Sequence, residues 1–191
     1  YRVKEASMSK LMSTKMAAGL TAKELKNMAS QLQGVTTYGD EAIIGMQSLM
    51  LTFTGIGKTV FPQATEAILN VATAMGTDLK SAAVQVGKAL NDPILGVSAL
   101  ARSGIQFSEA QKDVIKSLTE TGKLAEAQGI ILEELETQFG GAARAARDTF
   151  GGKTQSLSNA FGDSMEWVGG VIARVTAPHI AALTLEITDL N

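Results

Sequence analysis

Residues 61–76 read FPQATEAILNVATAMG, and this stretch decides the fold class. Its apolar side chains recur three and four positions apart, which places them on one face of an α-helix. Pro62 suits a first helical turn because its missing amide hydrogen is not needed there, and Gly76 offers a stop. The stretch therefore predicts one amphipathic helix with defined ends, and its apolar face consists of Ala64, Ala67, Ile68, Val71, Ala72 and Met75.

Two capping-box sequences, which mark helix starts, lie on either side of this stretch. Thr21 precedes Glu24 by three positions, and Ser108 precedes Gln111 by the same spacing. In such a capping box the hydroxyl and the side chain three residues later each satisfy an amide of the first turn. Helices are therefore predicted to begin just after Thr21 and just after Ser108.

The remaining boundaries follow from glycine, proline and the apolar stripes. Gly34 is predicted as a left-handed stop, and Asp40 as the cap of a mostly apolar helix that reaches Phe53. Further helices are predicted from about Leu79 to Asn91, from Pro93 to about Arg102, from Ser108 to Gly122 and from Leu124 to Phe139. One core is predicted to contain Ile68, Val71, Val86, Leu90, Val114, Ile115, Leu118, Ile131 and Leu135.

The chain beyond Gly141 has a different pattern. Apolar residues repeat at alternating steps of four and three, as in a coiled-coil seam, at Leu157, Phe161, Val168, Val171 and Val175, with Ser164 inside the seam, and again at Ile180, Leu183, Ile187 and Leu190. The predicted fold is all-α: an irregular bundle of short helices followed by longer heptad-patterned C-terminal helices. The predicted units are an N-terminal helix at 1–19, a compact bundle at 20–141 and a glycine-interrupted segment at 142–191.

Composition narrows the possible functions. The net charge is −2, and the basic residues do not cluster, which disfavours nucleic acid as a partner. The chain has no cysteine and one histidine, His179, so it lacks the ligands for a structural zinc site. No stretch has the ~20 apolar residues of a membrane span. Because the sequence begins at Tyr1, we expect a fragment of a longer protein. No catalytic residue, metal site or cofactor is expected.

One short motif resembles a phosphate-binding loop. Residues 55–59 read GIGKT, but Thr52 occupies the position of the first glycine, and a helix is predicted where a strand should precede the loop. The favoured interpretation is a flexible, glycine-rich loop between helices.

Two further groups have side chains that could act in catalysis. Glu133, Glu134 and Glu136 form a carboxylate cluster, but neighbouring helix positions point to different faces, which favours solvated surface over a glycosidase pair. His179 has no acidic or nucleophilic neighbour in the sequence. Methionines at 8, 12 and 16 lie at helical spacing, and this stripe is interpreted as core or as an adaptable partner surface.

Charge is unevenly distributed along the chain. Residues 1–34 carry six basic and two acidic side chains, and residues 105–139 carry three basic and seven acidic ones. Solvated helix faces explain this difference most simply, and attraction between the two regions or to separate partners is the alternative.

Several blocks in one order resemble the tail length tape measure proteins of phages and prophages. The blocks are FPQATEA at 61–67, ATAMGTDL at 72–79, GKALNDP at 87–93, GIQFSEAQ at 104–111, AQ at 127–128, ILEELE at 131–136 and FGGAA at 139–143. The resemblance covers about 40–165 and weakens towards both ends.

This resemblance implies a structural helical protein that helps to set tail length during assembly and occupies the tube lumen until ejection at infection. Tail tube protein, assembly chaperones and tail-tip proteins are the implied partners, and membrane contact is expected only at infection. The implied location is the virion tail, after assembly in the host cytoplasm. Self-association is predicted to depend mainly on 153–191. Two alternatives remain, a cell-wall hydrolase module and a membrane-active helical segment around Trp167.

Overall fold

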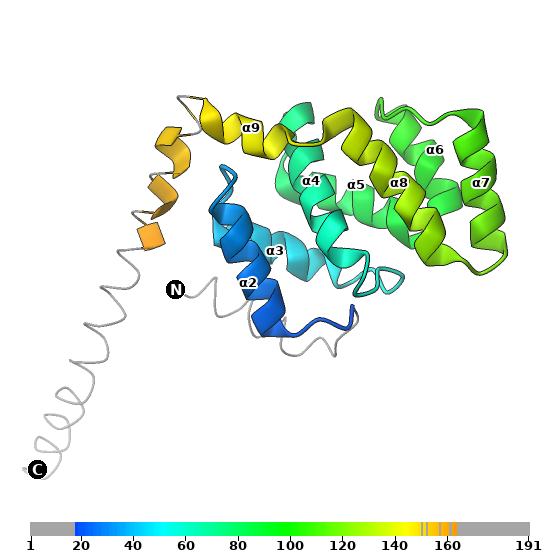
Figure 1. Ribbon diagram of the computed structural model, residues 1–191, viewed down its shortest axis with the longest axis horizontal. Helices are drawn as coiled ribbons and strands as arrows, with labels where there is room; N and C mark the ends of the chain where they lie inside the picture. Colours follow the sequence, from blue (N-terminus) through cyan, green and yellow to red (C-terminus); the bar gives the residue numbers. More distant parts are fainter. Residues whose placement is uncertain (1–17, 150, 152, 157, 161, 164–191) are drawn as a thin grey trace, which may run out of the picture.

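The computed structural model describes residues 18–149, 151, 153–156, 158–160 and 162–163. All regular secondary structure within these residues is helical (Figure 1), which confirms the predicted all-α class. The helices are α2 (Ala22–Gln33), α3 (Asp40–Met50), α4 (Phe61–Met75), α5 (Leu79–Asn91), α6 (Pro93–Arg102), α7 (Glu109–Glu120), α8 (Leu124–Phe139) and α9 (Ala142–Asp148).

Both predicted capping boxes are present. The Glu24 amide donates to the Thr21 hydroxyl at 3.2 Å, and the Thr21 amide donates to the Glu24 carboxylate at 2.7 Å. At α7 the Gln111 amide donates to the Ser108 hydroxyl at 3.2 Å, and the Ser108 amide donates to the Gln111 side chain at 2.8 Å. These reciprocal bonds satisfy amides that have no partner within the helix, and so they fix where α2 and α7 begin.

The start and end of α4 also agree with the sequence. Pro62 lies in the first turn. Gly76 adopts φ +63°, and the next amide, that of Thr77, donates to the carbonyl of Ala72 at 3.0 Å. This is the left-handed ending for which glycine has no steric penalty.

The predicted boundary between α2 and α3 is wrong in its details. Gly34 has φ −61° and is right-handed, because the chain continues into a turn in which the Thr36 hydroxyl donates to the carbonyl of Leu32 at 2.8 Å. Asp40 is the first residue of α3 and not its cap. Its backbone amide donates to the side-chain carbonyl of Gln33. A residue seven positions earlier thus accepts the hydrogen bond of a first-turn amide, as an N-cap side chain usually does.

Helix α3 also ends earlier than predicted. It stops at Met50, and the amides of Thr52 and Phe53 donate three residues back, to Leu49 and Met50, at 3.0 Å each. This tighter turn leads into the loop before α4.

One hydrophobic core joins the helices, and α4 contributes most to it. Phe61, Ala64, Ile68 and Val71 of α4 are fully buried. Every predicted core residue except Val114 is buried or packs against this core. Val114 was predicted wrongly, since 48% of its surface is exposed. Its neighbour Ile115 faces inward, and a step of one residue turns a side chain by about 100° around the helix.

Figure 1 shows α2 and α3 on one side, α6 and α7 on the other, and α4, α5 and α8 between them. Helix α9 packs on α4, and the helical residues at 151–163 continue from it past the α2–α3 turn. There the side-chain amide of Asn159 donates to the backbone carbonyl of Thr37 at 3.1 Å. The side-chain amide of Gln33 donates to the carboxylate of Asp163. The seam positions Leu157, Phe161 and everything from Ser164 onward lie outside the described residues, as do residues 1–17 of the helix predicted at 1–19. Its last two residues, Ala18 and Gly19, are not helical.

Candidate functional site

The phosphate-loop motif lies in the connection between α3 and α4. A helix precedes it, and the ammonium group of Lys58 pairs with Glu24 at 3.0 Å. A phosphate-binding loop requires a preceding strand and a lysine directed at the phosphates. The arrangement therefore favours the interpretation of residues 55–59 as an interhelix loop.

Hydrogen bonds hold this loop at Gly55, whereas the sequence predicted a flexible loop. The amide of Gly55 donates to the side-chain oxygen of Asn91 at 2.9 Å. The buried amide group of Gln128 donates to the carbonyls of Gly55 and Leu90, both at 2.8 Å. One buried side chain thus joins α8 to the end of α5 and to the α3–α4 loop.

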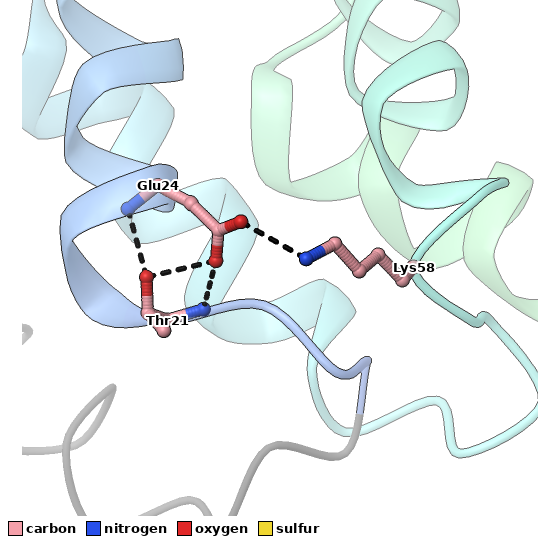
Figure 2. A network of polar contacts seen from close by, with 3 residues as sticks. All are labelled: Thr21, Glu24 and Lys58. Atoms are coloured by element: carbon pink, nitrogen blue, oxygen red, sulfur yellow. Dashed lines mark hydrogen bonds and ion pairs between the residues drawn. The ribbon is translucent and has the colours of Figure 1, made fainter.

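A second contact holds the other end of the loop (Figure 2). The Glu24 carboxylate accepts hydrogen bonds from the amide and hydroxyl of Thr21 and contacts the Lys58 ammonium group. The Thr21 backbone amide is the main cause of a Glu24 pKa lowered to about 2, and the Lys58 contact comes next. The network connects the start of α2 to the residues just before α4.

The three glutamates of α8 do not form one set. Glu134 accepts from the amides of Gln111 at 2.5 Å and Gln138 at 2.7 Å, so it belongs to the contact between α7 and α8. Glu133 and Glu136 lie three positions apart and line the same cleft. The separation of Glu134 confirms that adjacent positions face different ways. The cleft beside Glu133 and Glu136 was not predicted from the sequence.

The cleft lies between α4 and α8 and has a volume of about 640 Å³. Its lining includes three carboxylates and no basic side chain. Glu66 of α4 is already paired, because its carboxylate accepts from the Arg144 guanidinium at 2.7 and 3.1 Å. The remaining lining residues are Gln63, Ala67, Gly129, Leu132, Glu133, Glu136 and Thr137.

The geometry of the cleft suits binding better than acid–base catalysis. A general acid needs a carboxyl group that its surroundings keep protonated, usually by burial. Glu133 and Glu136 are both exposed on an open cleft. Two exposed carboxylates over an apolar floor favour a partner that is cationic and partly apolar.

Helix α9 closes one end of this region. The amide of Ala143 donates to the buried side-chain oxygen of Asn70 at 3.0 Å. Together with the pair between Glu66 and Arg144, this bond places α9 on α4. Neither contact was predicted from the sequence.

A second acidic group lies at the α2–α3 turn. Carboxylate oxygens of Asp40, Glu41 and Asp163 approach within 4.8 Å of one another. Such oxygens are the ligands that hard cations prefer. Gln33, however, already binds both the amide of Asp40 and the carboxylate of Asp163, so a polar contact between α2 and the residues near 163 accounts for the grouping.

The remaining sequence candidates are one histidine and a stripe of methionines. His179 and the methionines at 8, 12 and 16 lie outside the described residues. Gln128 was missed, although its position was informative, because it lies on the apolar stripe between Leu124 and Ile131. A polar side chain on such a stripe is buried and must find partners.

Comparison of the sequence with protein-family models gives no match, and comparisons with curated proteins and with solved structures give none either. Among the described residues, the longest and most apolar helices still fall short of what a bilayer crossing requires.

Proposed function

We propose that this chain is a segment of a phage or prophage tail length tape measure protein. In this role it is a structural element without catalytic residues, which helps to set tail length during assembly and occupies the tube lumen until infection. Its partners are the tail tube protein, assembly chaperones and tail-tip proteins. The observation that carries the proposal is the ordered series of sequence blocks that resembles this family.

The positions of these blocks support the proposal. The block at 87–93 spans the junction of α5 and α6, the block at 104–111 leads into α7, and the block at 139–143 forms the turn into α9. Junctions contain the residues that fix a helical fold, such as the Ser108 cap and Gly141 at φ +76°. Other blocks, at 61–67, 127–128 and 131–136, lie inside α4 and α8, so the resemblance includes both helix junctions and core helices.

The length that this segment contributes to a ruler depends on whether it is folded or extended. As one straight helix, 191 residues reach roughly 290 Å, at about 1.5 Å per residue. Residues 20–141 instead pack around one core. A folded unit of that length has a diameter of about 35 Å, compared with about 180 Å for a straight helix. We propose that this unit stays folded in the assembled tail.

Duplication of residues 20–141 within the parent gene tests the proposal. Electron microscopy of the tails measures the change in length. An increase of about 35 Å fits a folded ruler unit, and about 180 Å fits an extended one. A matched control inserts an unrelated helical domain of the same length after Gly140. Unchanged tails with the duplication remove a direct ruler role for this region.

The heptad-patterned residues beyond 153 are proposed to drive self-association. A seam of this kind exposes an apolar edge unless it meets another helix. Light scattering on the full chain and on a chain that ends at Ala143 tests this role. The full chain is expected to associate and the shorter one to be monomeric. The same number of chains per particle in both proteins would contradict the role of these residues in self-association.

The acidic cleft keeps one alternative open, a cell-wall hydrolase module. Two carboxylates beside a groove are the arrangement that glycoside hydrolysis uses. If the purified chain clears a peptidoglycan gel and a Glu133→Gln variant does not, the alternative replaces the structural role. We expect no clearing by either protein.

A further inference from the structure

We infer that the cleft between α4 and α8 is the docking site for the basic N-terminal segment, residues 1–17, of the same chain. The inference rests on five features: the charge of the cleft, its floor, the charge of the two ends of the chain, the place where the chain joins α2, and the lengths of the segment and the cleft. It stands apart from the proposed role in tail length.

The cleft carries negative charge that the described part of the chain does not neutralise. Of its three carboxylates, only Glu66 has an ion-pair partner within the described residues, Arg144. Within the same residues no cation lies within ion-pair distance of Glu133 or Glu136. Two like charges beside one groove favour a cationic occupant.

The floor of the cleft is built for close approach. Leu132 and Ala67 are buried, and the exposed Gly129 lines the same cleft. A Cβ added to Gly129 would meet nothing within 4 Å, so no contact in the described structure requires glycine there. Glycine destabilises a helix interior relative to alanine, and it is used where another backbone approaches closely.

Charge selects the N-terminal segment over the C-terminal one. Residues 1–17 carry four basic side chains and one acidic side chain, a net charge of +3. Residues 164–191 carry one basic and three acidic side chains, a net charge of −2. An acidic cleft attracts the first segment and repels the second. The N-terminal segment also has apolar residues at helical spacing, Met8, Leu11, Met12 and Met16, which suit the apolar floor.

The N-terminal segment joins the described chain beside the loop that leads into α4. A Cβ on Gly19 would lie 3.5 Å from the Cβ of Lys58, and the pair between Lys58 and Glu24 fixes this approach (Figure 2). Lys58 shortly precedes α4, whose first turns contribute Gln63 to the cleft.

The lengths of the segment and the cleft also match. As a helix, residues 8–16 span about 12 Å, which equals the span of residues 129–137 along α8. Seventeen residues can therefore place Met12 over Leu132 and the lysines at 10 and 15 near Glu133 and Glu136.

Crosslinking of the full chain tests the inference, because the protein has no cysteine. The test variant carries Met12→Cys and Thr137→Cys, and a short bismaleimide reagent joins thiols that lie close together. We expect a crosslinked monomer as the main product. The matched control pairs Met12→Cys with Lys88→Cys, a residue of a different cleft between α5 and α6, and should give little product.

A charge reversal then tests whether electrostatic attraction holds the N-terminal segment in the cleft. Lys10→Glu with Lys15→Glu, added to the Met12 and Thr137 cysteines, should lower the intrachain yield about fivefold or more. Lys10 and Lys15 are not among the residues that make up the described core, and circular dichroism of the variant checks that the helices remain folded. Adding Glu133→Lys and Glu136→Lys should restore the yield.

Three outcomes would overturn the inference. The first is a product that joins two chains, which would make a second copy the occupant. The second is an equal yield from the Lys88 control, and the third is a yield that charge reversal does not change. Tail length does not enter this test, so its failure would leave the proposed function standing.

Discussion

The inner helices and the outer attachments of this protein are held by different kinds of contact. The inner helices are α4, α5, α6 and α8, joined by fully buried side chains and by the Gln128 amide. The outer elements bury fewer side chains, such as Leu25 and Ala29 of α2 and Ala143 of α9. They add three exposed or half-buried polar contacts, Glu24 with Lys58, Arg144 with Glu66, and Gln33 with Asp163. Exposed ion pairs contribute little and weaken in salt, whereas buried contacts do neither. We therefore expect the outer elements to open before the inner helices do.

The largest expected effect comes from the inner core. Ile131→Ala removes a fully buried side chain and should lower the free energy of unfolding by about 2–5 kcal/mol. Val114→Ala changes a half-exposed residue and should cost less than about 0.5 kcal/mol. Urea denaturation followed by circular dichroism measures both. Similar losses for the two variants would remove the distinction between inner and surface positions.

Glycine substitutions test how closely the inner helices approach. A Cβ on Gly96 would overlap the backbone of Ala89 where α5 meets α6, and one on Gly87 would overlap the ring of Phe53. Gly96→Ala should therefore cost about 1–3 kcal/mol. Gly45→Ala is the matched control, since its Cβ would meet nothing within 4 Å, and it should stabilise α3 by about 0.5–1 kcal/mol. The comparison fails if Gly96→Ala is neutral in the same thermal or urea unfolding assay.

The buried amide should matter more than an exposed one on the same helix. Gln128→Leu leaves the carbonyl of Leu90 without its side-chain donor, and should cost about 1–3 kcal/mol. Gln138 donates to the carbonyl of Gln106 at 2.6 Å in an exposed setting, so Gln138→Leu should cost less than about 1 kcal/mol. Urea unfolding midpoints measure both losses of stability. A larger loss for Gln138→Leu than for Gln128→Leu would contradict the greater importance of the buried amide.

The smallest expected effect is a pH dependence at an outer attachment. Hydrogen bonding in the folded state lowers the pKa of Glu24 from 4.5 to about 2. Its contribution to stability is therefore complete above pH 4.5 and is lost as the pH falls towards 2. Relative to a Glu24→Gln variant, the wild type should lose stability across this window.

A second variant separates the causes of that shift. Lys58→Met removes one contact but keeps the Thr21 amide, which is the larger cause. Most of the pH dependence should therefore remain in this variant. Thermal unfolding measured from pH 2 to 6 tests both expectations, and an equal pH response in wild type and Glu24→Gln would refute the role of the carboxylate.

Local signals explain what could be predicted from the sequence. The caps at Thr21 and Ser108 and the stop at Gly76 depend on residues within a few positions, so the pattern alone predicts them. The start of α3 was predicted wrongly because Gln33, seven residues away, occupies the cap's role.

Contacts between distant segments explain what could not be predicted. The acidic cleft combines Glu66 with Glu133 and Glu136, residues on helices whose packing no local pattern specifies. The position of Gln128 on an apolar stripe predicts its burial, but its two carbonyl partners lie on other segments and become visible only in the fold.

Hydrogen exchange on the intact chain measures the difference between the inner helices and the outer attachments most directly. Backbone amides of α4, α5 and α8 should exchange together and last, through near-global opening. Amides of the first turn of α2, of α9 and of the described residues from 153 to 163 should exchange earlier. The gap should widen in 1 M salt, where the Debye length falls to about 3 Å. Uniform protection across these regions, or a gap that salt leaves unchanged, would contradict the account.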